Sequence, residues 1–482
     1  MRILLLQPQV FSPGISFITT DPRRVSMGLL YIAAVLDKAG HNVTVKLATK
    51  GNIQHLMEKA SPEIVGFSVM TPDYPYTKEL IKTVKQENPK THTVLGGYHP
   101  TFRPEEVLKE TETDYVIRGE GENAMLQLAT ALQGKENLSN VTNLSYKKGN
   151  QIIHNKMGPL VDVNTLPFPA REKVNVPFTL INESRGCPYA CTFCCIRNFY
   201  GGTWRPRKIE NFIAELAYMK EKLGYKRIYI ESDNFLVNPK RVQAICKAII
   251  EHGLNDVSYN SSGRIDVMAK NPKLLDLMVE AGWKSMNFGL ESGIQEILDN
   301  SYNKHMTLQQ ARKVIKKLQD TNIHVGWTFI IGSGDEYDTE AYIQKSIDFL
   351  LSIPYDAVGL TILTPFPGTA LFQKLRRENR ILTYNWKLYD LLHCVYKPKY
   401  LSPQKMEELY SKALWEIYKN GGPTNIIKRA IKAFRANYIS PRDFLGLCQL
   451  SLRVYGKRKN INEVYELYAD KYYKKIEKLC KK

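Results

Sequence analysis

The sequence predicts an α/β protein in three parts: a doubly wound, Rossmann-like parallel sheet, a partial (β/α)6 barrel, and a mostly helical basic tail. Two observations lead to this order. Short apolar runs alternate with helical patterns from the N-terminus to about residue 390, which is typical of parallel sheets. The final 82 residues instead carry 18 Lys and Arg against 8 Asp and Glu, so they hold +10 of the net charge of +19.

Composition indicates a soluble protein of the cytoplasm. Hydrophobic residues make up 43% and charged residues 24% of the chain, as in ordinary globular proteins. No apolar run reaches the ~18 residues of a membrane span, and Arg2–Pro8 is too short for a signal-peptide core. Eight cysteines, three of them clustered, favour a reducing compartment over a disulfide framework.

The first predicted domain covers residues 1–135. Its strands are expected at Arg2–Leu6, Asn42–Leu47, Ile64–Ser68, Thr93–Leu95 and Tyr115–Ile117. Its helices are expected at Gly28–Ala39, Ile53–Ala60, Tyr76–Gln86, Pro104–Glu110 and Ala124–Leu132. Such sheets bind ligands beyond the carboxyl ends of their strands, where glycines let the backbone approach a large ligand. The residues expected at that edge are Gln7, Ser68, Met70, Thr71, Gly96, Gly97, Tyr98, His99, Gly119, Glu120 and Glu122.

Residues 136–177 are predicted to connect this domain to the next. Leu144–Ile153 has the pattern of a small hairpin that turns at Gly149, and Pro167, Pro169 and Pro177 mark an extended linker.

Residues 178–390 are predicted to form the barrel core. Six strands are expected, at Phe178–Asn182, Arg227–Glu231, Val257–Asn260, Ser285–Leu290, Val325–Ile331 and Ala357–Leu363. The helices that follow them are expected to begin near Glu210, Pro239, Pro272, Leu308, Thr339 and Thr369. Each strand is followed by polar or glycine residues, and in barrels chemistry gathers at the carboxyl ends of the strands.

A loop directly after the first barrel strand carries Cys187, Cys191 and Cys194 in a C-x3-C-x2-C spacing. Thiolates this close converge on zinc or on an iron–sulfur cluster. Structural zinc takes four ligands, usually as two short pairs far apart, and the sequence has no second Cys/His pair. Three thiolates would leave one iron of a [4Fe–4S] cluster open to an outside ligand.

This loop, with the aromatic Phe193 before its last cysteine, resembles the signature of the radical S-adenosylmethionine (SAM) enzymes. The resemblance implies that Cys187, Cys191 and Cys194 hold a [4Fe–4S] cluster whose open iron binds the amino and carboxylate groups of SAM. In that family an electron from the cluster cleaves SAM to a 5′-deoxyadenosyl radical. Cys195 is interpreted as a neighbour of the cluster and not as a ligand, and no catalytic residue beyond the cluster ligands is assigned.

Polar residues at the barrel strand ends match family positions that contact SAM. Asp233 or Glu291 suits its ammonium or ribose, and Arg264 suits its carboxylate in a bidentate pair. For each residue, an ordinary strand-end hydrogen bond is the alternative. The loop Gly332–Glu336 departs from the usual Gly-x-Pro-Gly-Glu, so its contact with the cofactor stays open. The SAM-binding residues that the resemblance implies are Phe193, Ser232, Asp233, Asn234, Arg264, Glu291 and Ser292.

The segments Gly96–Thr101 and Asp114–Glu122 resemble the cobalamin-binding domain that precedes many radical SAM cores. The resemblance implies that the edge residues of the first domain bind cobalamin. The D-x-H-x-x-G motif of methionine-synthase-type domains is absent, so we expect no histidine on the lower face of cobalamin. His41 is interpreted as structural. The alternative is a flavodoxin-like domain for some other ligand.

The resemblance runs from Arg2 to Thr369 and is closest to the group containing cobalamin-dependent methylases and the anaerobic magnesium-protoporphyrin ester cyclase. It implies methylation of an unactivated carbon, with an external electron donor of the flavodoxin or ferredoxin type. The alternatives within this family are oxidative cyclisation and ring rearrangement. Outside it, the alternatives are RNA modification, prompted by the charge although no nucleic-acid partner is expected, and a non-catalytic cobalamin or electron carrier.

The tail, residues 391–482, suggests contact with a membrane surface. A family segment that closes the barrel mouth is resembled by Tyr384–Asp390 and His393, around the start of the tail. The aromatic rings of this segment either line a substrate pocket or pack in the core. Ile427–Phe434 forms an apolar stripe interleaved with basic residues. We therefore expect a cytoplasmic protein held peripherally at the inner membrane face, acting on a hydrophobic substrate. The alternative is a tail folded against the barrel.

Overall fold

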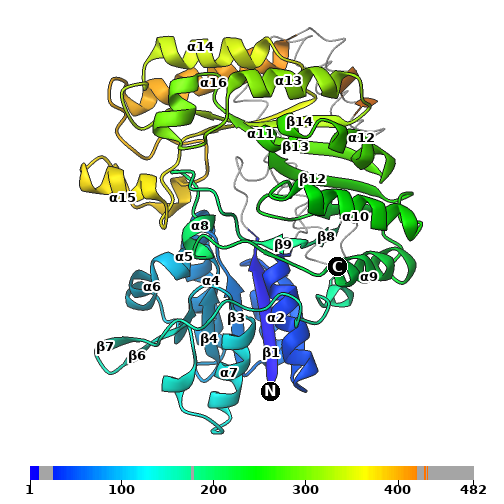
Figure 1. The fold of residues 1–482 in the computed structure, drawn as a ribbon. Helices are drawn as coiled ribbons and strands as arrows, with labels where there is room; N and C mark the ends of the chain where they lie inside the picture. The colour runs from blue at the N-terminus through cyan, green and yellow to red at the C-terminus, as the bar shows by residue number, and fades with distance from the viewer. Residues whose placement is uncertain (10–24, 175–178, 421–427, 430, 433–482) are drawn as a thin grey trace.

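The computed structural model describes residues 1–9, 25–174, 179–420, 428–429 and 431–432 (Figure 1). An N-terminal sheet with its helices lies at one end of the molecule and a barrel sheet with its helices at the other. The structure confirms the predicted fold class.

The N-terminal sheet has the strand order β2-β1-β3-β4-β5-β6-β7. The first five strands in sequence are parallel, and the last two add to the edge in antiparallel pairing. The predicted hairpin is confirmed, and the structure makes it part of this sheet, because Tyr146 pairs with Tyr115. The strands are β1 Arg2–Pro8, β2 Asn42–Ala48, β3 Ile64–Ser68, β4 His92–Gly96, β5 Tyr115–Ile117, β6 Leu144–Lys148 and β7 Gln151–His154.

Helices cover both faces of this sheet. Ile3 and Leu5 of β1 join the apolar cluster under α2 and α7, and Leu4 and Leu6 join the cluster under α3 and α4. A strand buried on both faces must be apolar at every position, which explains the unbroken apolar run in β1. The helices are α2 Met27–Lys38, α3 Ile53–Ala60, α4 Tyr74–Glu87, α5 Tyr98–Phe102, α6 Pro104–Glu110 and α7 Glu122–Leu132.

The short helix α5 was not predicted. It begins directly after Gly97, whose φ of +98° is a left-handed conformation that favours glycine. A Cβ at Gly97 would lie 2.8 Å from the carbonyl oxygen of Val69. The glycine-rich turn therefore allows close packing of the chain after β4 against the chain after β3.

The barrel sheet has the strand order β15-β14-β13-β12-β11-β8, with every pairing parallel. The two edge strands, β8 and β15, do not pair, so the barrel is open, as predicted. The strands are β8 Thr179–Ile181, β11 Arg227–Ile230, β12 Ser258–Arg264, β13 Trp283–Glu291, β14 His324–Ile331 and β15 Ala357–Ile362.

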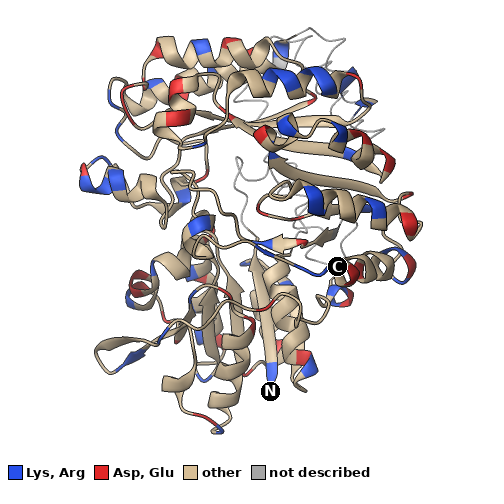
Figure 2. Ribbon diagram, viewed as in Figure 1, with Lys and Arg blue, Asp and Glu red and all other residues tan. Residues whose placement is uncertain are grey.

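Helices on the outside of the barrel carry Lys, Arg, Asp and Glu at intervals along their length (Figure 2). They are α9 Ile209–Glu221, α10 Pro239–Glu251, α11 Ile265–Lys270, α12 Lys273–Glu280, α13 Leu308–Gln319, α14 Glu340–Leu351, α15 Ala370–Arg377 and α16 Pro403–Lys419. Two very short strands, β9 Ser184–Arg185 and β10 Arg205–Pro206, and the one-turn helix α8 Ile196–Phe199 flank the cysteine loop.

The segment after α15 packs against the N-terminal sheet. Trp386 and Tyr389 are buried in the same apolar cluster as Leu4 and Leu6, and the indole N–H of Trp386 donates to Glu106. For Trp386 and Tyr389 the structure shows core packing, whereas Tyr384 of the same segment is exposed.

Most of the basic tail lies outside the described residues. Three basic residues of the stripe Ile427–Phe434 are described. Lys428 is exposed, whereas the guanidinium of Arg429 lies 4.1 Å from the ring centre of Tyr355 and Lys432 Nζ lies 2.6 Å from Asp356 Oδ2. Within the described ranges, no helix is both long and apolar enough to cross a membrane.

Candidate active site

The cysteine loop leaves the barrel through a turn that only glycine fits. Gly186 has φ +88°, and a Cβ there would lie 2.1 Å from the carbonyl oxygen of Thr203. Its N–H donates to Asp233 Oδ2 at 2.7 Å, which ties the start of the loop to the end of β11. The side chains of Cys187, Cys191 and Cys194 are partly accessible. In the described part of the chain, no three Cys, His, Asp or Glu side chains meet closely enough to hold a single ion.

The thiols lie near one another and near basic groups. Burial raises the pKa of Cys194, and the neighbouring thiols of Cys195, Cys191 and Cys187 add to the rise. Burial also raises the pKa of Cys191, while Lys304 and Arg264 act against that rise. At Cys191 the two cations therefore lessen the rise of the pKa but do not cancel it.

Arg264, the last residue of β12, lies beside this loop. Its Nη1 is 3.8 Å from Cys191 Sγ, and its guanidinium stacks 4.0 Å from the ring centre of Tyr189. Nε donates to Asp266 Oδ1 at 2.9 Å, and Nη2 donates to the carbonyl oxygen of Lys304. The residue predicted to bind a carboxylate is thus held next to the cysteines.

Glu291, the last residue of β13, has φ +67°, which is rare for a residue with a side chain. Its Oε1 accepts from Lys304 Nζ at 2.6 Å, and its Oε2 accepts from Thr328 Oγ1 at 3.1 Å. Backbone strain of this kind costs about 1–3 kcal/mol and persists where the surrounding structure demands it, often at functional sites. Lys304 was not predicted, because the loop that carries it has no local motif.

The turn after β11 places three predicted residues close together. Asn234 Oδ1 accepts from the backbone N–H of Arg264 at 3.2 Å, and the side-chain amide nitrogen of Asn234 is buried without a partner among the described residues. Ser232 Oγ donates weakly to Glu183 at 3.5 Å. Burial raises the pKa of Asp233, opposed by the Gly186 N–H and by Arg185 and Arg205.

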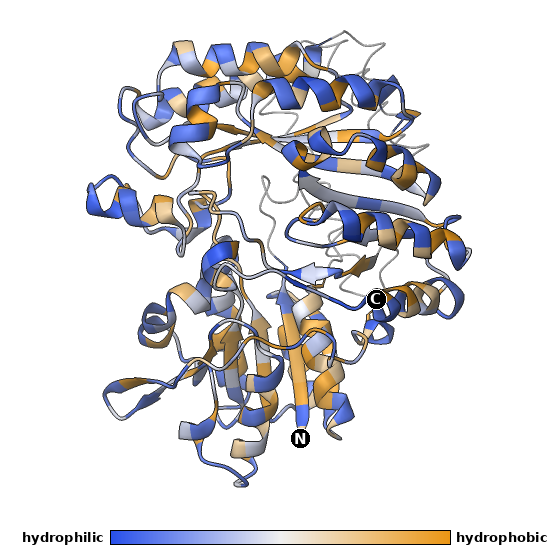
Figure 3. Cartoon of the chain, in the orientation of Figure 1, coloured by the Kyte–Doolittle hydropathy of each residue, from blue (hydrophilic) through white to orange (hydrophobic). Residues whose placement is uncertain are grey.

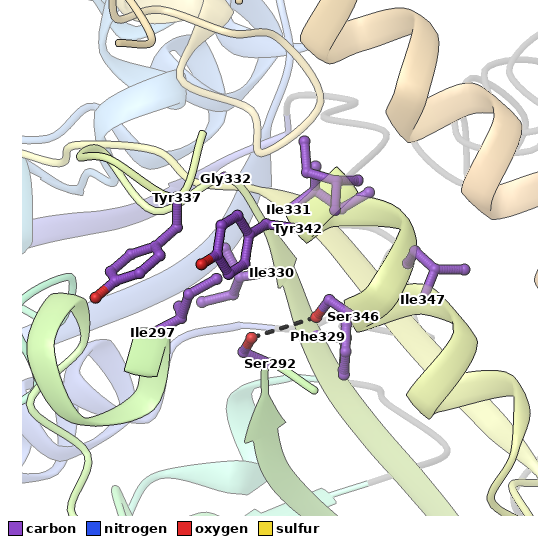
Figure 4. A pocket seen from close by; sticks show the side chains of 11 residues that line it. Ser292, Ile297, Phe329, Ile330, Ile331, Gly332, Tyr337, Tyr342, Ser346 and Ile347 are labelled. Atoms are coloured by element: carbon purple, nitrogen blue, oxygen red, sulfur yellow. Dashed lines mark hydrogen bonds between the residues drawn. The ribbon is translucent and has the colours of Figure 1, made fainter. Parts of the chain in front are cut away.

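The last two predicted SAM-binding residues, Ser292 and Phe193, contact different neighbours. Ser292 Oγ is 3.2 Å from Ser346 Oγ on α14, at the wall of a small cavity (Figure 4). The Phe193 ring meets the edge of Tyr302 at 5.2 Å. The full lining of that cavity is Ser292, Ile297, Phe329, Ile330, Ile331, Gly332, Tyr337, Tyr342, Ile343, Ser346 and Ile347.

The loop after β14, which departs from the family pattern, is held by hydrogen bonds to its own carboxylates. Ser333 N donates to Asp338 Oδ1 at 2.7 Å, and Ser333 Oγ donates to Asp335 Oδ1 at 2.6 Å. The hydroxyl of Tyr396 donates to Asp338 as well, at 3.3 Å. These bonds stabilise the turn without the usual proline.

The carboxyl edge of the N-terminal sheet faces the cysteine loop. The ring of Tyr98 on α5 lies 4.7 Å from that of Phe199 on α8 (Figure 1). Burial raises the pKa of Tyr98 well above its usual value, and nearby Tyr200 and Asp233 add to the rise. Met70 is exposed, and Gln7 bridges the chain by donating to the Ser68 carbonyl at 3.5 Å and accepting from Ser26 N at 3.4 Å.

Comparison with known proteins identifies both parts. Residues 19–129 match the family model described as B12 binding domain, and residues 181–350 match the model described as Radical SAM superfamily. The chain is 31% identical over 465 residues to an uncharacterized methyltransferase of Pyrococcus horikoshii, covering 91% of this chain and 99% of that protein. The chain belongs to the radical SAM superfamily.

Two further likenesses support this. The anaerobic magnesium-protoporphyrin IX monomethyl ester cyclase of Cereibacter sphaeroides is 25% identical, over 83% of this chain and 68% of its own length. The solved structure of OxsB, a cobalamin-dependent SAM radical enzyme with aqua-cobalamin bound, superposes with a TM-score of 0.68 at 18% identity, covering 93% of this chain and 71% of that one. The cofactors of this radical SAM enzyme are a [4Fe–4S] cluster, SAM and cobalamin, as predicted.

The residues of this radical SAM enzyme fit those groups. Three soft donors on one loop suit a cluster, and Arg264 and Glu291 offer opposite charges beside it, suited to the carboxylate and ammonium of SAM. The unpartnered amide nitrogen of Asn234 is a donor available at the same place. On the other side, Gly97 and Gly119 take left-handed conformations at the sheet edge, so no side chain extends from these two positions. The ligand role of each individual residue stays a prediction.

Three residues predicted for the cobalamin edge are engaged elsewhere in this radical SAM enzyme. His99 is fully buried, stacked 4.3 Å from Tyr74 and edge-on to Trp386, and burial followed by nearby Arg103 lowers its pKa to about 3. Glu120 and Glu122 accept from Arg185 at 2.8 and 2.7 Å. These contacts occupy the three side chains, and their part in cobalamin binding stays a prediction.

Arg185, like Lys304, is a residue of the site that was not predicted from the sequence. It directly precedes Gly186 and Cys187, and besides its two carboxylates it stacks 4.9 Å from the ring centre of Tyr31. Arg205 adds a second cation to Glu120 at 2.8 Å. This buried group of charges joins the cysteine loop to the B12-binding domain.

Proposed function

We propose that this radical SAM enzyme transfers a methyl group to an unactivated carbon of a small-molecule substrate. The observation that carries the proposal is the contact of the cysteine loop with the carboxyl edge of the B12-binding domain, through Tyr98 beside Phe199 and through Arg185 beside Glu120 and Glu122. A methyl group carried on one cofactor must reach a carbon activated at the other. Two adjoining sites are what such a transfer requires.

The overall reaction consumes two molecules of SAM for each methylated product. A C–H bond of the substrate breaks, a C–C bond to the methyl carbon forms, and the hydrogen ends in 5′-deoxyadenosine. One SAM yields methionine and 5′-deoxyadenosine, a second yields S-adenosylhomocysteine, and an external flavodoxin- or ferredoxin-type donor supplies one electron for each. When bound, the cluster supplies the electron that cleaves SAM, and cobalamin carries the methyl group.

The chain's own residues bind and orient. Arg264 offers its guanidinium to the SAM carboxylate after releasing the carbonyl oxygen of Lys304. Glu291 offers its carboxylate to the SAM ammonium after releasing the ammonium of Lys304. Arg185 holds the loop that carries the cysteines against the B12-binding domain. The loop from Gly332 to Asp338 is fixed by internal hydrogen bonds and closes the barrel edge beside them.

Anaerobic reconstitution tests the proposal. Protein loaded with cluster and cobalamin, given SAM, reductant and a cell extract, is expected to form S-adenosylhomocysteine and 5′-deoxyadenosine in equal amounts, with one methylated product. Oxidative cyclisation or rearrangement is the second candidate, favoured by the likeness to the ester cyclase. It would give 5′-deoxyadenosine without S-adenosylhomocysteine. A non-catalytic carrier would give neither.

Membrane contact is the less supported part of the sequence prediction. Four of the eight residues of the stripe Ile427–Phe434 lie outside the described residues. Of its described basic residues, Lys428 is exposed, while Arg429 and Lys432 are engaged by Tyr355 and Asp356 of the barrel. These contacts favour the alternative of a tail folded on the barrel. Flotation with anionic liposomes tests it: intact protein that floats while a chain ending near Leu401 does not would restore the membrane prediction. The expectation of a hydrophobic substrate was based on the tail alone.

A further inference from the structure

Side chains of the barrel strands alternate between two faces, as the pleat requires. One face packs against the helices and is apolar, as Met286, Phe288 and Leu290 of β13 show. The opposite face looks into the barrel, and the strand register places its residues side by side: Asn260 beside Tyr229, and Asn287 beside Ser262. We call this face the inner wall. It consists of Tyr229, Asn260, Ser262, Asn287, Thr328, Ile330 and Thr361.

The inner wall is polar and accessible. Six of its seven residues carry a hydroxyl or an amide, and all seven are half-buried, so they are not sealed in a core. On β12 and β13, Asn260, Ser262 and Asn287 precede Arg264 and Glu291 in their strands, so they lie deeper in the barrel than the residues predicted to bind SAM.

Small residues widen the space in front of the inner wall. Gly359 on β15 lies beside Thr328, and a Cβ there would meet nothing closer than 3.8 Å. Gly326 lies beside Asn287, whose Oδ1 occupies the position of the missing side chain, 2.2 Å from where a Cβ would be. Glycine at these positions in a strand leaves room for a ligand or for a neighbouring polar group.

Part of the hydrogen-bonding capacity of the inner wall is unused. Tyr229 and Ser262 bond each other, with 2.6 Å between their hydroxyl oxygens, and Thr361 Oγ1 makes one long bond of 3.4 Å to the carbonyl oxygen of Phe329. The Oδ1 of Asn260 is buried and has no partner among the described residues. Buried polar groups are normally hydrogen-bonded, so an unpartnered one on the half-buried inner wall points to a ligand.

We propose that the part of the substrate that enters the barrel carries hydroxyl or amide groups, so that the enzyme modifies a polar metabolite and not a hydrocarbon lipid. This inference rests on the methyl-transfer function proposed above. An apolar ligand would displace water from the inner wall without replacing its hydrogen bonds, which is unfavourable at every such group. A hydroxyl- or amide-bearing ligand replaces them.

The test separates substrates by polarity. Reconstituted holoenzyme receives SAM labelled with a trideuterated methyl group, together with either the water-soluble or the chloroform-soluble fraction of an extract from the source cells. Mass spectrometry then follows the gain of a trideuteromethyl group. We expect the labelled product in the water-soluble fraction. Label only in the lipid fraction overturns the inference but leaves methyl transfer standing, and label in neither fraction overturns both.

Variants tie the result to the inner wall. Asn287→Ala and Thr361→Val each remove one hydrogen-bonding group and are expected to lower kcat/KM for the labelled product by roughly tenfold, mainly through KM. Thr130→Val is the matched control, because the Thr130 hydroxyl also bonds a backbone carbonyl, that of Leu126, but lies on α7 of the other domain. Circular dichroism and iron content verify folding. Unchanged kcat/KM in both wall variants would contradict the inference.

Discussion

The two parallel sheets of this protein differ in what covers them. In the N-terminal sheet, Ile3 to Leu6 of β1 are all buried at 2% exposure or less, because helices pack on both faces. In the barrel sheet, β12 alternates between buried and half-buried residues, because only its outer face is covered. Figure 3 shows the same difference as a hydrophobic β1 and a pale to hydrophilic β12.

This difference separates two ways of making a binding site. A sheet covered on both faces has only its strand ends free, so the B12-binding domain presents Gly97, Gly119 and Met70 at its edge. An open barrel also exposes an inner face, which can be polar without loss of stability since water or ligand reaches it. The same alternation of strands and helices thus produces an edge site in one half and an interior site in the other.

The largest expected effect is on the barrel side and concerns function. Cys191→Ala is expected to abolish the visible absorption of the cluster and all SAM cleavage, because two thiolates do not hold it. Cys195→Ala, the matched control on the same loop, should keep both. Absorption spectra and 5′-deoxyadenosine formation measure this. Equal loss in the Cys195 variant would refute the assignment of three ligands.

A polar substitution in each sheet tests whether the two sheets differ in how deeply their side chains are buried. Leu4→Asn puts an amide where both faces are buried, and we expect it to destabilise the N-terminal domain by about 4–6 kcal/mol through lost burial and an unpaired amide. Ile330→Asn puts the same group on the half-exposed inner wall, where about 1 kcal/mol is expected. Urea unfolding followed by tryptophan fluorescence compares the two midpoints. Similar shifts would show that the barrel interior is as dry as the other core.

The charges that join the two halves come next. Arg185→Ala leaves Glu120 with Arg205 alone and Glu122 without its charged partner, and breaking a buried pair costs about 3–5 kcal/mol. Lys78→Ala, which breaks the surface pair with Glu110, should cost no more than about 1 kcal/mol. Limited proteolysis between the two domains should accelerate only in the Arg185 variant. Equal resistance in both would mean that apolar contacts alone hold the halves together.

The smallest expected effect is on the pH dependence of stability in acid. Glu120 is buried, which by itself raises its pKa, but Arg205 and Arg185 outweigh burial and the pKa is lowered below 4.5. A lowered folded-state pKa stabilises the fold fully above pH 4.5, and that stability is lost as the pH falls through the folded-state value. Glu120→Gln should therefore flatten the fall of the unfolding midpoint between about pH 4.5 and pH 3. A fall as steep as in the unmodified protein would exclude Glu120 as its source.

Much of the fold could be predicted from sequence because it depends on local patterns. Strand β3 and helix α6 have the predicted bounds, since period-2 and period-3.6 apolar patterns and the flanking prolines and glycines are local signals. The order of six parallel barrel strands follows from the repeated strand–helix unit. The cysteine loop was visible from spacing alone, because its donors lie within eight residues.

The partners of polar groups that are far apart in the chain could not be predicted, because they depend on tertiary packing. Glu120 and Arg185, 65 residues apart, are paired by the docking of the two halves, and the local sequence around neither residue indicates this pair. His99 shared a glycine-rich segment with Tyr98, but α5 turns its ring into the core while Tyr98 faces the cysteine loop. Lys304 reaches Glu291 only because a loop folds back over β13. Sequence periodicity reports which face of an element is buried, whereas the identity of a partner depends on how separate elements pack, which no local pattern encodes.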